Sequence, residues 1–173
     1  IFILFCTNNV FSQSYIDSLL KISESKDIYT KAMALAKLAE KLSEAGDLRS
    51  LDYAQQSFSF IDQIKDNNSI ALIYKVMGLG YDLKGYYSAA LNYYLKAQVL
   101  FFNENNYKEL ITTLNNSAVI YINQGNLIKA NEYYLKELEF AEKLKDSLSM
   151  AIAYSNLAQI QYQLNNLEKA YKY

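Results

Sequence analysis

The chain of 173 residues contains no histidine, no proline and no tryptophan, and it has a single cysteine, Cys6. Histidine is the commonest general base near neutral pH and the commonest metal ligand in proteins. One cysteine can form neither an intrachain disulfide nor a thiolate metal cluster. Triads of the Ser-His-Asp or Cys-His type are therefore excluded, and we expect no catalytic, metal or cofactor site in this chain.

An excess of charge of one sign is also lacking, because 17 basic residues stand against 18 acidic ones and give a formal net charge of −1. Balanced charge provides no long-range attraction for a polyanion, so nucleic acid is not an expected partner. The hydrophobic fraction of 51% is enough for a sizeable core. The absence of proline permits uninterrupted helices.

Acidic side chains cluster at two places where a carboxylate pair could arise. Glu137, Glu139 and Glu142 lie within one segment, and Glu40 and Glu44 lie within another. We interpret both groups as solvated faces of helices, where charged residues usually lie. Catalysis by these carboxylates is not expected.

Residues 1–12 resemble the end of an export signal. The stretch Ile1–Cys6 is wholly apolar, and Val10 and Ser12 fit the −3 and −1 positions of a cleavage site. We expect a signal-peptide remnant and an exported protein, periplasmic or on the extracytoplasmic face. Two alternatives are open for the apolar stretch: the end of a transmembrane helix, or a buried first strand or helix. The alternative location of the protein is the cytoplasm. Residues 166–173 begin a helix and stop within about two turns, so the chain is expected to continue.

A self-similar unit returns every 39 or 40 residues. Large residues recur at one set of offsets, small residues at another and turn residues at a third. The large positions include Tyr74, Leu114 and Tyr154, then Tyr81, Tyr121 and Gln161; the small positions are Ala39, Gly78, Ala118 and Ala158, then Ala54, Ala90, Ala130 and Ala170. This regularity predicts an array of stacked helical repeats.

Each unit is typical of two amphipathic helices joined by a turn. In residues 70–109 the apolar residues recur at spacings of three and four. A residue that tolerates the left-handed conformation and can end a helix stands at one offset, namely Gly46, Gly85, Gly125 and Asn165. The predicted N-caps are Asp47, Asn126 and Asn166 for the second helices, with Ser69 and Ser149 for the first helices.

These offsets resemble the tetratricopeptide repeat, with its large, small, aromatic and alanine positions. The resemblance covers residues 32–173, in units of about 32–69, 70–109, 110–149 and a truncated 150–173. It implies an all-α fold, a right-handed α-solenoid of antiparallel helix pairs. The region 14–31 is expected to form a capping helix. A period of about 40 exceeds the 34 typical of the family, as in bacterial sensor and signalling members.

The resemblance also implies a groove lined by the first helices of the units. Its offsets hold Lys75 in one unit, Asn115 and Asn116 in the next, and Asn156 and Gln159 in the last. Amide side chains both donate and accept hydrogen bonds, so this ladder could hold the backbone of an extended peptide. The alternative is that the ladder is plain solvated surface.

Some members of the family use a carboxylate clamp on peptide C termini, but its further basic residues are absent here. Their offsets are occupied by Thr112, Ile152 and Asn156. We therefore expect protein or peptide binding without a strong requirement for a terminal carboxylate.

The main functional expectation is an interaction module for proteins or peptides, the exported N-terminal sensory or scaffold part of a larger bacterial signalling protein. A structural assembly scaffold is one alternative. An accessory domain of an enzyme whose catalytic part lies elsewhere is another. Contact with a membrane is expected only through regions outside this segment.

Overall fold

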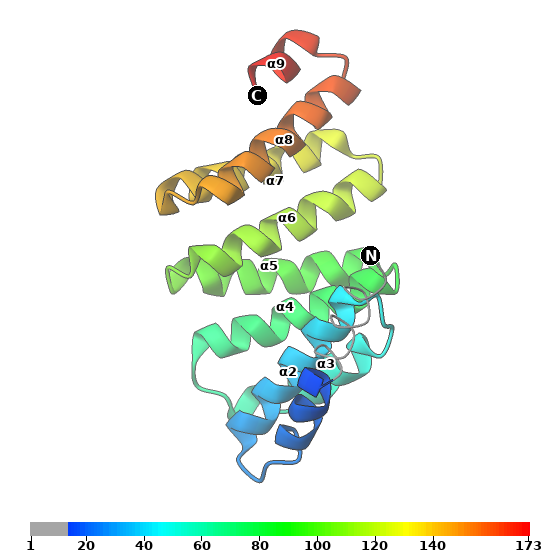
Figure 1. Cartoon of the computed structure of the whole chain (residues 1–173), viewed down its shortest axis with the longest axis vertical. Coiled ribbons are helices and arrows are strands. Elements are labelled where there is room, and N and C mark those ends of the chain that lie inside the picture. The colour runs from blue at the N-terminus through cyan, green and yellow to red at the C-terminus, as the bar shows by residue number, and fades with distance from the viewer. Residues whose placement is uncertain (1–13) are drawn as a thin grey trace. The chain divides into compact units, whose positions relative to one another are not determined.

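The computed structural model describes residues 14–173, and all the regular structure within that range is helical (Figure 1). The signal-peptide remnant predicted at residues 1–12 lies outside the described residues. A first helix covers residues 14–22. It is followed by α2 (Ile28–Glu44), α3 (Ser50–Phe58), the 3-10 turn η1 (Ile61–Gln63), α4 (Asn67–Leu83), α5 (Tyr87–Asn103), α6 (Tyr107–Asn123), α7 (Leu127–Leu144), α8 (Ser147–Gln163) and α9 (Leu167–Lys172).

The helices form pairs, and the first helices of the pairs begin at Ile28, Asn67, Tyr107 and Ser147. These starts are 39, 40 and 40 residues apart, which is the period of the sequence pattern. They precede the repeat boundaries expected from the sequence by three or four residues. The predicted all-α fold of antiparallel helix pairs is confirmed.

The chain divides into two compact units within α5. Unit 1 extends to Tyr93, and unit 2 runs from Tyr94 to Tyr173. Each unit has its own core of alanines and large aliphatic residues, with aromatic rings in it or packed against it. The units are described separately below.

The turns inside the pairs contain the residues that the sequence pattern predicts. Gly46, Gly85, Gly125 and Asn165 have φ angles of 72°, 77°, 73° and 60°. A side chain is strained in this left-handed region, which explains why glycine occupies three of the four positions. Asn105 and Lys145, which follow α5 and α7, are also left-handed, each with a φ of 55°. Nothing in the sequence pattern identified these last two.

The caps of the first helices lie one turn earlier than predicted, so the assignment of Ser69 and Ser149 was wrong. Asp66 accepts a hydrogen bond from the Ser69 amide, and Asp146 accepts one from the Ser149 amide. The hydroxyl of each serine also donates to the same aspartate, and these bonds hold the pKa of Asp66 and Asp146 below their usual value. The serines are therefore the donors in a cap that the aspartates provide.

The predicted caps of the second helices are realised in part. The Asn126 side chain accepts from the Lys129 amide and caps α7. Asn166 occupies the N-cap of α9, but its amide donates to Gln161 instead of capping. Asp47 precedes the N-cap residue of α3, Arg49, and accepts from both the Arg49 amide and its guanidinium.

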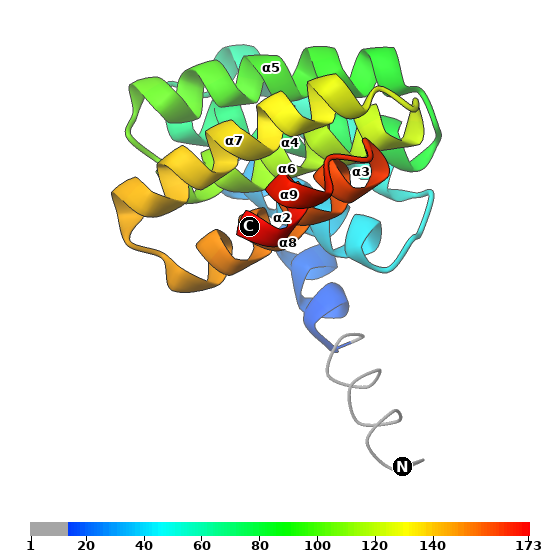
Figure 2. The same cartoon turned by 90° about the horizontal axis from the view of Figure 1, so that it is seen from above.

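In unit 1, α3 packs closely on α4, and the helix of residues 14–22 packs on α2. Gly80 of α4 lies so near α3 that a Cβ atom added there would be 2.7 Å from the Leu51 Cα. The helix of residues 14–22 lies beside α2 in Figure 2, and its Leu19 is buried against Leu38 and Leu42. The apolar periodicity of these segments therefore corresponds to packed faces.

Tyrosine rings pair between the first and second helix of a repeat. In unit 1 the rings of Tyr81 and Tyr93 stack with centroids 5.5 Å apart. In unit 2 the rings of Tyr121 and Tyr133, each 40 residues further along, lie 5.3 Å apart. The regular spacing of tyrosines thus reflects packing of helix pairs, with offset or tilted rings as aromatic pairs prefer.

The core of unit 2 joins three helices. Ala118 of α6, Ala130 and Tyr134 of α7, and Leu157 and Ile160 of α8 are buried together. Alanines on α6 and α7 allow the backbones to approach closely, as the sequence pattern predicts. This core fixes which sides of α6 and α8 remain exposed.

Candidate protein-binding surface

The exposed sides of α6 and α8 form the candidate surface, which we call the α6/α8 face. Both helices pack on α7, and Figures 1 and 2 show them on the same side of it. The face consists of Thr112, Asn115, Asn116, Val119 and Asn123 on α6, with Leu148, Ile152, Ser155, Asn156, Gln159 and Tyr162 on α8. Their spacing of three and four residues places each set along one side of its helix.

This face carries no charge. Helix α8 contains no Asp, Glu, Lys or Arg over its 17 residues, and α6 has none after Glu109. Leu148, Ile152 and Tyr162 of α8 are nevertheless 71%, 45% and 69% exposed. A solvent-exposed helix normally places charged residues opposite its buried side. An uncharged exposed side with large apolar residues is instead typical of a surface that another molecule covers.

The four amides predicted for peptide binding lie on this face. Asn115, Asn116 and Asn156 are half-buried and Gln159 is exposed. Among the described residues, no side chain or backbone group forms a hydrogen bond with the side-chain amides of these four residues. Their donors and acceptors are thus open to a partner, although binding by them stays a prediction.

Lys75, the fifth predicted site residue, has a different environment. It belongs to unit 1, is only 2% exposed, and its Nζ lies 2.6 Å from Glu40 Oε1. The interpretation of Glu40 as part of a plain solvated face was therefore incomplete, because the carboxylate neutralises a buried ammonium. The two residues are 35 positions apart on α2 and α4, and no local sequence pattern reports such a pair.

Glu137 corrects a second expectation. The sequence placed it with Glu139 and Glu142 on a solvated helix face, but its side chain is 2% exposed, whereas the other two are exposed. It shares the buried side of α7 with Ala130 and Tyr134. The signal was present in the repeat pattern, since Glu137 stands at the position where the preceding repeat has the buried Ala97.

Burial changes the proton affinity of this carboxyl group. Loss of hydration raises the pKa of Glu137 to about 7. Its Oε2 has no hydrogen-bond partner within residues 14–173. Burial, and then the charge of Glu137, raises the pKa of the neighbouring Tyr134 to about 12. A carboxyl group with this pKa binds a proton reversibly near neutral pH.

Gln161 occupies the offset where the two preceding repeats place a paired tyrosine. It is buried, donates from Nε2 to Asn131 Oδ1 at 2.8 Å, and accepts from Asn166 Nδ2 at 3.0 Å. A polar bridge between α7, α8 and the start of α9 thus replaces the ring pair. The departure from the sequence pattern has a structural reason and does not indicate a ligand.

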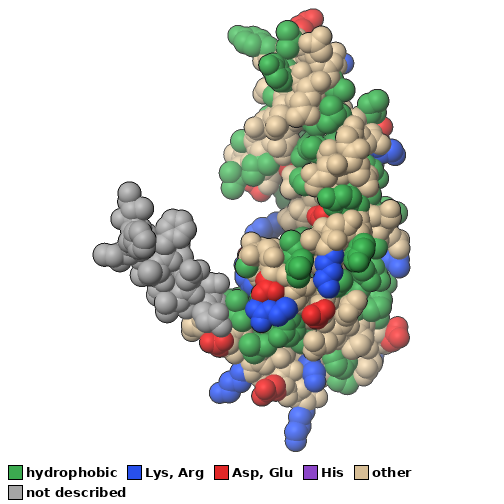
Figure 3. Space-filling model, turned by 90° about the vertical axis from the view of Figure 1, so that its right-hand side faces the viewer, with side chains coloured by type: hydrophobic (Ala, Val, Ile, Leu, Met, Phe, Trp, Pro, Cys, Tyr) green, Lys and Arg blue, Asp and Glu red, His purple; other side chains and the backbone are tan. Residues whose placement is uncertain are grey.

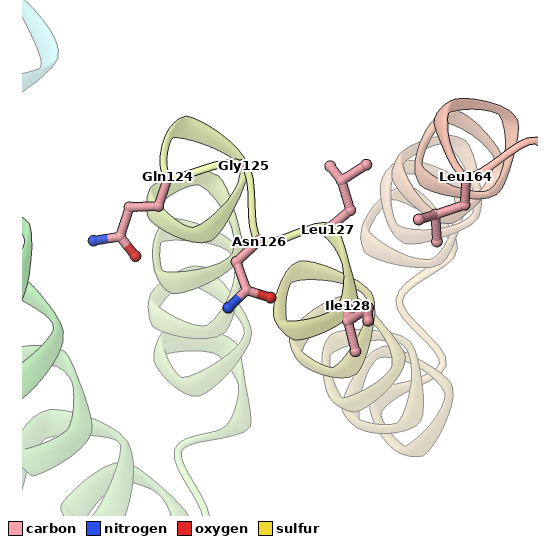
Figure 4. Close-up of a pocket in the computed structure, with 6 residues that line it drawn as sticks. All are labelled: Gln124, Gly125, Asn126, Leu127, Ile128 and Leu164. Atoms are coloured by element: carbon pink, nitrogen blue, oxygen red, sulfur yellow. The ribbon is translucent and has the colours of Figure 1, made fainter.

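A hollow of about 390 Å³ lies at the turn between α6 and α7, next to the end of α8 (Figure 4). It is lined by Gln124, Gly125, Asn126, Leu127, Ile128 and Leu164. The Asn126 side-chain oxygen is already used as the cap of α7. The lining contains no titratable group, so the hollow offers only shape and apolar contact.

Charges elsewhere on the surface are mixed. Figure 3 shows basic and acidic side chains interspersed among hydrophobic ones on the side of the molecule that it presents. Within residues 14–173, no group of His, Cys, Asp or Glu side chains is arranged to hold a metal ion. None of the helices in this range combines the length and the apolar character needed to cross a membrane.

Known proteins share both sequence and fold with this chain. A family model described as tetratricopeptide repeat matches residues 109–173. The protein ycf37 of Guillardia theta is 35% identical over 78 residues, which are 45% of this chain and 40% of that protein. The sequence resemblance to this family is thereby confirmed.

Solved structures with the same fold include two larger proteins. One is a signal transduction ATPase with a tetratricopeptide repeat sensor from Pyrococcus horikoshii, with a TM-score of 0.81 at 22% identity over 96% of this chain and 26% of that one. Another is aspartyl phosphate phosphatase F from Bacillus subtilis, with a TM-score of 0.81 at 21% identity over 91% of this chain and 42% of that one. The chain spans less than half the length of each of these proteins and of ycf37.

Proposed function

We propose that this chain, a protein-interaction module that carries tetratricopeptide repeats, binds an extended and uncharged segment of a partner protein on the α6/α8 face. The observation that carries the proposal is the uncharged exposed side of α8, with Leu148, Ile152 and Tyr162 in solvent. Apolar side chains of the partner would cover these residues, and each buried methylene group contributes about 0.8 kcal/mol.

The amides of the face would serve the backbone of the same segment. Asn115, Asn116 and Asn156 alternate with the apolar residues along the two helices. An extended backbone presents both N–H and C=O groups, and an amide side chain can pair with either. A charged partner residue would lose hydration here without meeting an opposite charge, which disfavours charged segments.

The test is a selection of random 12-residue peptides displayed on phage against the immobilised chain. We expect the selected peptides to be apolar and uncharged, and their capture to change little between low and high salt. The variant Ile152→Asp should abolish capture. The control is Leu135→Asp on α7, because Leu135 is 42% exposed and Ile152 is 45% exposed. Selection of charged peptides, or equal loss in both variants, would contradict the proposal.

A second candidate function is assembly of copies of this chain. The unit 2 part of α5 exposes Leu95, Val99 and Phe102 by 55%, 52% and 52%, and these residues lie along one side of the helix. Sedimentation velocity tests this role: a concentration-dependent dimer that disappears in a Leu95→Asp/Val99→Asp variant would favour assembly. A monomer at all concentrations would leave peptide binding as the function.

We also propose that the module is the exported sensory part of a longer bacterial signalling protein and has no catalytic role of its own. The support for export is the apolar stretch Ile1–Cys6 with Val10 and Ser12 in the pattern of a cleavage site. The support for a sensory role is the similar fold of an ATPase whose repeats are described as a sensor. Sequencing the N terminus of the protein purified from its cells tests export, and an uncleaved N terminus would contradict it.

A further inference from the structure

The buried carboxyl group of Glu137 has no function in the proposed binding surface. It lies on the side of α7 that packs in the core, with Ala130, Tyr134 and Ala141 on the same side. Its Oε2 has no hydrogen-bond partner among the described residues. An ionised carboxylate in such a place loses its hydration without compensation, which is costly.

The helices around α7 offer no cation to balance this charge. Helix α8 has no charged residue, and the charged residues of α6 are confined to its first turn. Helix α5 reaches α7 through the ring contact of Phe102 with Phe140 and has only Lys96, which is exposed, as a charged residue in unit 2. The titratable side chains on these helices in unit 2 are Tyr94, Lys96, Tyr107, Lys108, Glu109, Tyr121, Tyr154 and Tyr162.

The repeat itself shows what the position accommodates without cost. In the preceding repeat the equivalent residue is Ala97, which is fully buried. A neutral glutamic acid can be accepted in such a site, because protonation removes the charge and gives the group a donor of its own. The ionised form keeps its charge and has no hydrogen to donate.

We propose that Glu137 is a proton-controlled switch of helix packing in unit 2. With a proton bound, α7 stays packed against α6 and α8. Without it, the contact between α7 and α8 opens more often, because water can then hydrate the carboxylate. The direction of the pH dependence of stability follows from the two pKa values of this carboxyl group. The pKa of Glu137 is about 7 in the folded chain, against 4.5 for an unperturbed group. The folded state therefore holds the proton more tightly, and stability falls as the pH rises toward and through 7.

Hydrogen exchange of the whole chain at pH 6 and pH 8, corrected for intrinsic exchange rates, tests this switch. The opening constant of α7 and α8 should rise by about tenfold between these pH values, which follows from a folded pKa near 7. Helix α4 should show no such rise. The variant Glu137→Gln keeps the shape and should abolish the increase, whereas Glu139→Gln, two residues away and exposed, should retain it.

Two outcomes would overturn the proposal: a tenfold rise that persists in Glu137→Gln, or one that disappears in Glu139→Gln. If Glu137→Gln does not fold, Glu137→Ala takes its place, because the preceding repeat has alanine there. Failure of both variants to fold would show that the carboxyl group is needed for structure and would also overturn the switch.

The consequence for a partner rests on the proposed function. Because α8 carries half of the α6/α8 face, a peptide selected on that face should bind only the closed form, and a saturating concentration of it should lower the opening constant of α7 and α8 at both pH values. A correct exchange pattern with no peptide binding at either pH would count against the proposed function and not against the switch.

Discussion

The first helices of unit 1 and of unit 2 use the same repeat positions in opposite ways. In unit 1 these positions hold Glu40 on α2 and Lys75 on α4, which form an ion pair with the ammonium buried. The equivalent positions in unit 2 hold Val119 on α6 and Ser155 on α8, both of them exposed. An ion pair connects α2 with α4, whereas α6 and α8 present an uncharged surface.

The second contrast concerns the distance between helices. Gly80 lets α3 approach α4 closely in unit 1. The same repeat position holds Ile120 and Ile160 in unit 2, and both are buried. The repeat pattern therefore determines which positions of neighbouring helices contact each other. The size and charge of the residues at a few positions determine whether the contact is close, contains an ion pair or is filled by a large side chain.

The largest effect on stability is expected when Gly80 is replaced by the isoleucine that unit 2 has at the same repeat position. Gly80→Ile should lower the free energy of unfolding by at least about 3 kcal/mol, because the side chain would overlap the backbone of α3. Gly80→Ala should lie between this variant and the parent. Urea unfolding followed by circular dichroism measures both. Parental stability in Gly80→Ile would show that α3 and α4 are not in close contact.

The next effect concerns the ion pair. Glu40→Gln leaves the Lys75 ammonium buried without its carboxylate, and we expect a loss of about 2 kcal/mol, less than for a fully buried pair because Glu40 is partly exposed. The control is Glu44→Gln, whose pair with Lys41 is exposed and whose loss should cost less than about 0.5 kcal/mol. Thermal unfolding compares the two. Equal effects would remove the distinction between the buried and the exposed pair.

A smaller effect is expected at the cap of α7. Asn126→Ala removes the acceptor of the Lys129 amide and should cost about 1 kcal/mol. Asn123→Ala, an exposed change at the last residue of α6, serves as the control and should be nearly neutral. A urea titration of both variants decides, and the prediction fails if their midpoints coincide.

No loss of stability is expected on the α6/α8 face. Replacing Asn115, Asn116 and Asn156 together by alanine should not lower the free energy of unfolding, because no described residue forms a hydrogen bond with these side-chain amides and alanine is the better helix former. The same variant should bind a selected peptide at least tenfold more weakly, since each lost hydrogen bond contributes about 0.5–1.5 kcal/mol. Gln55→Ala/Gln56→Ala, exposed on α3, is the control. Unchanged peptide binding in the triple variant would move the binding site elsewhere.

The repeat frame could be predicted from sequence because its signals are local. Gly46, Gly85, Gly125 and Asn165 report a backbone conformation that few residues tolerate, and alanines at fixed offsets report close helix contacts. The cap signal of Asp66 and Asp146 is also local. The sequence pattern predicts the helix starts about one turn too late, however, and therefore favours the neighbouring serines.

The depth of individual polar residues could not be predicted in the same way. Lys75 and Glu137 look like ordinary surface residues in the sequence, yet both are buried. Burial depends on what the neighbouring helices place opposite each residue, and for Lys75 that partner is 35 positions away. Only the alignment of Glu137 with Ala97 contained a hint, since it put a charged residue where the preceding repeat has a core alanine.

The lack of charge on α8 also has a consequence for the order of folding. Helix α7 contains Glu132 and Glu139 four residues before Lys136 and Lys143, and such pairs support a helix even when it is isolated. Helix α8 has no such pair, so most of its helical stability must come from the helices on which it packs. We therefore expect the α6–α7 hairpin to form first during folding and α8 to become helical as it docks onto that hairpin.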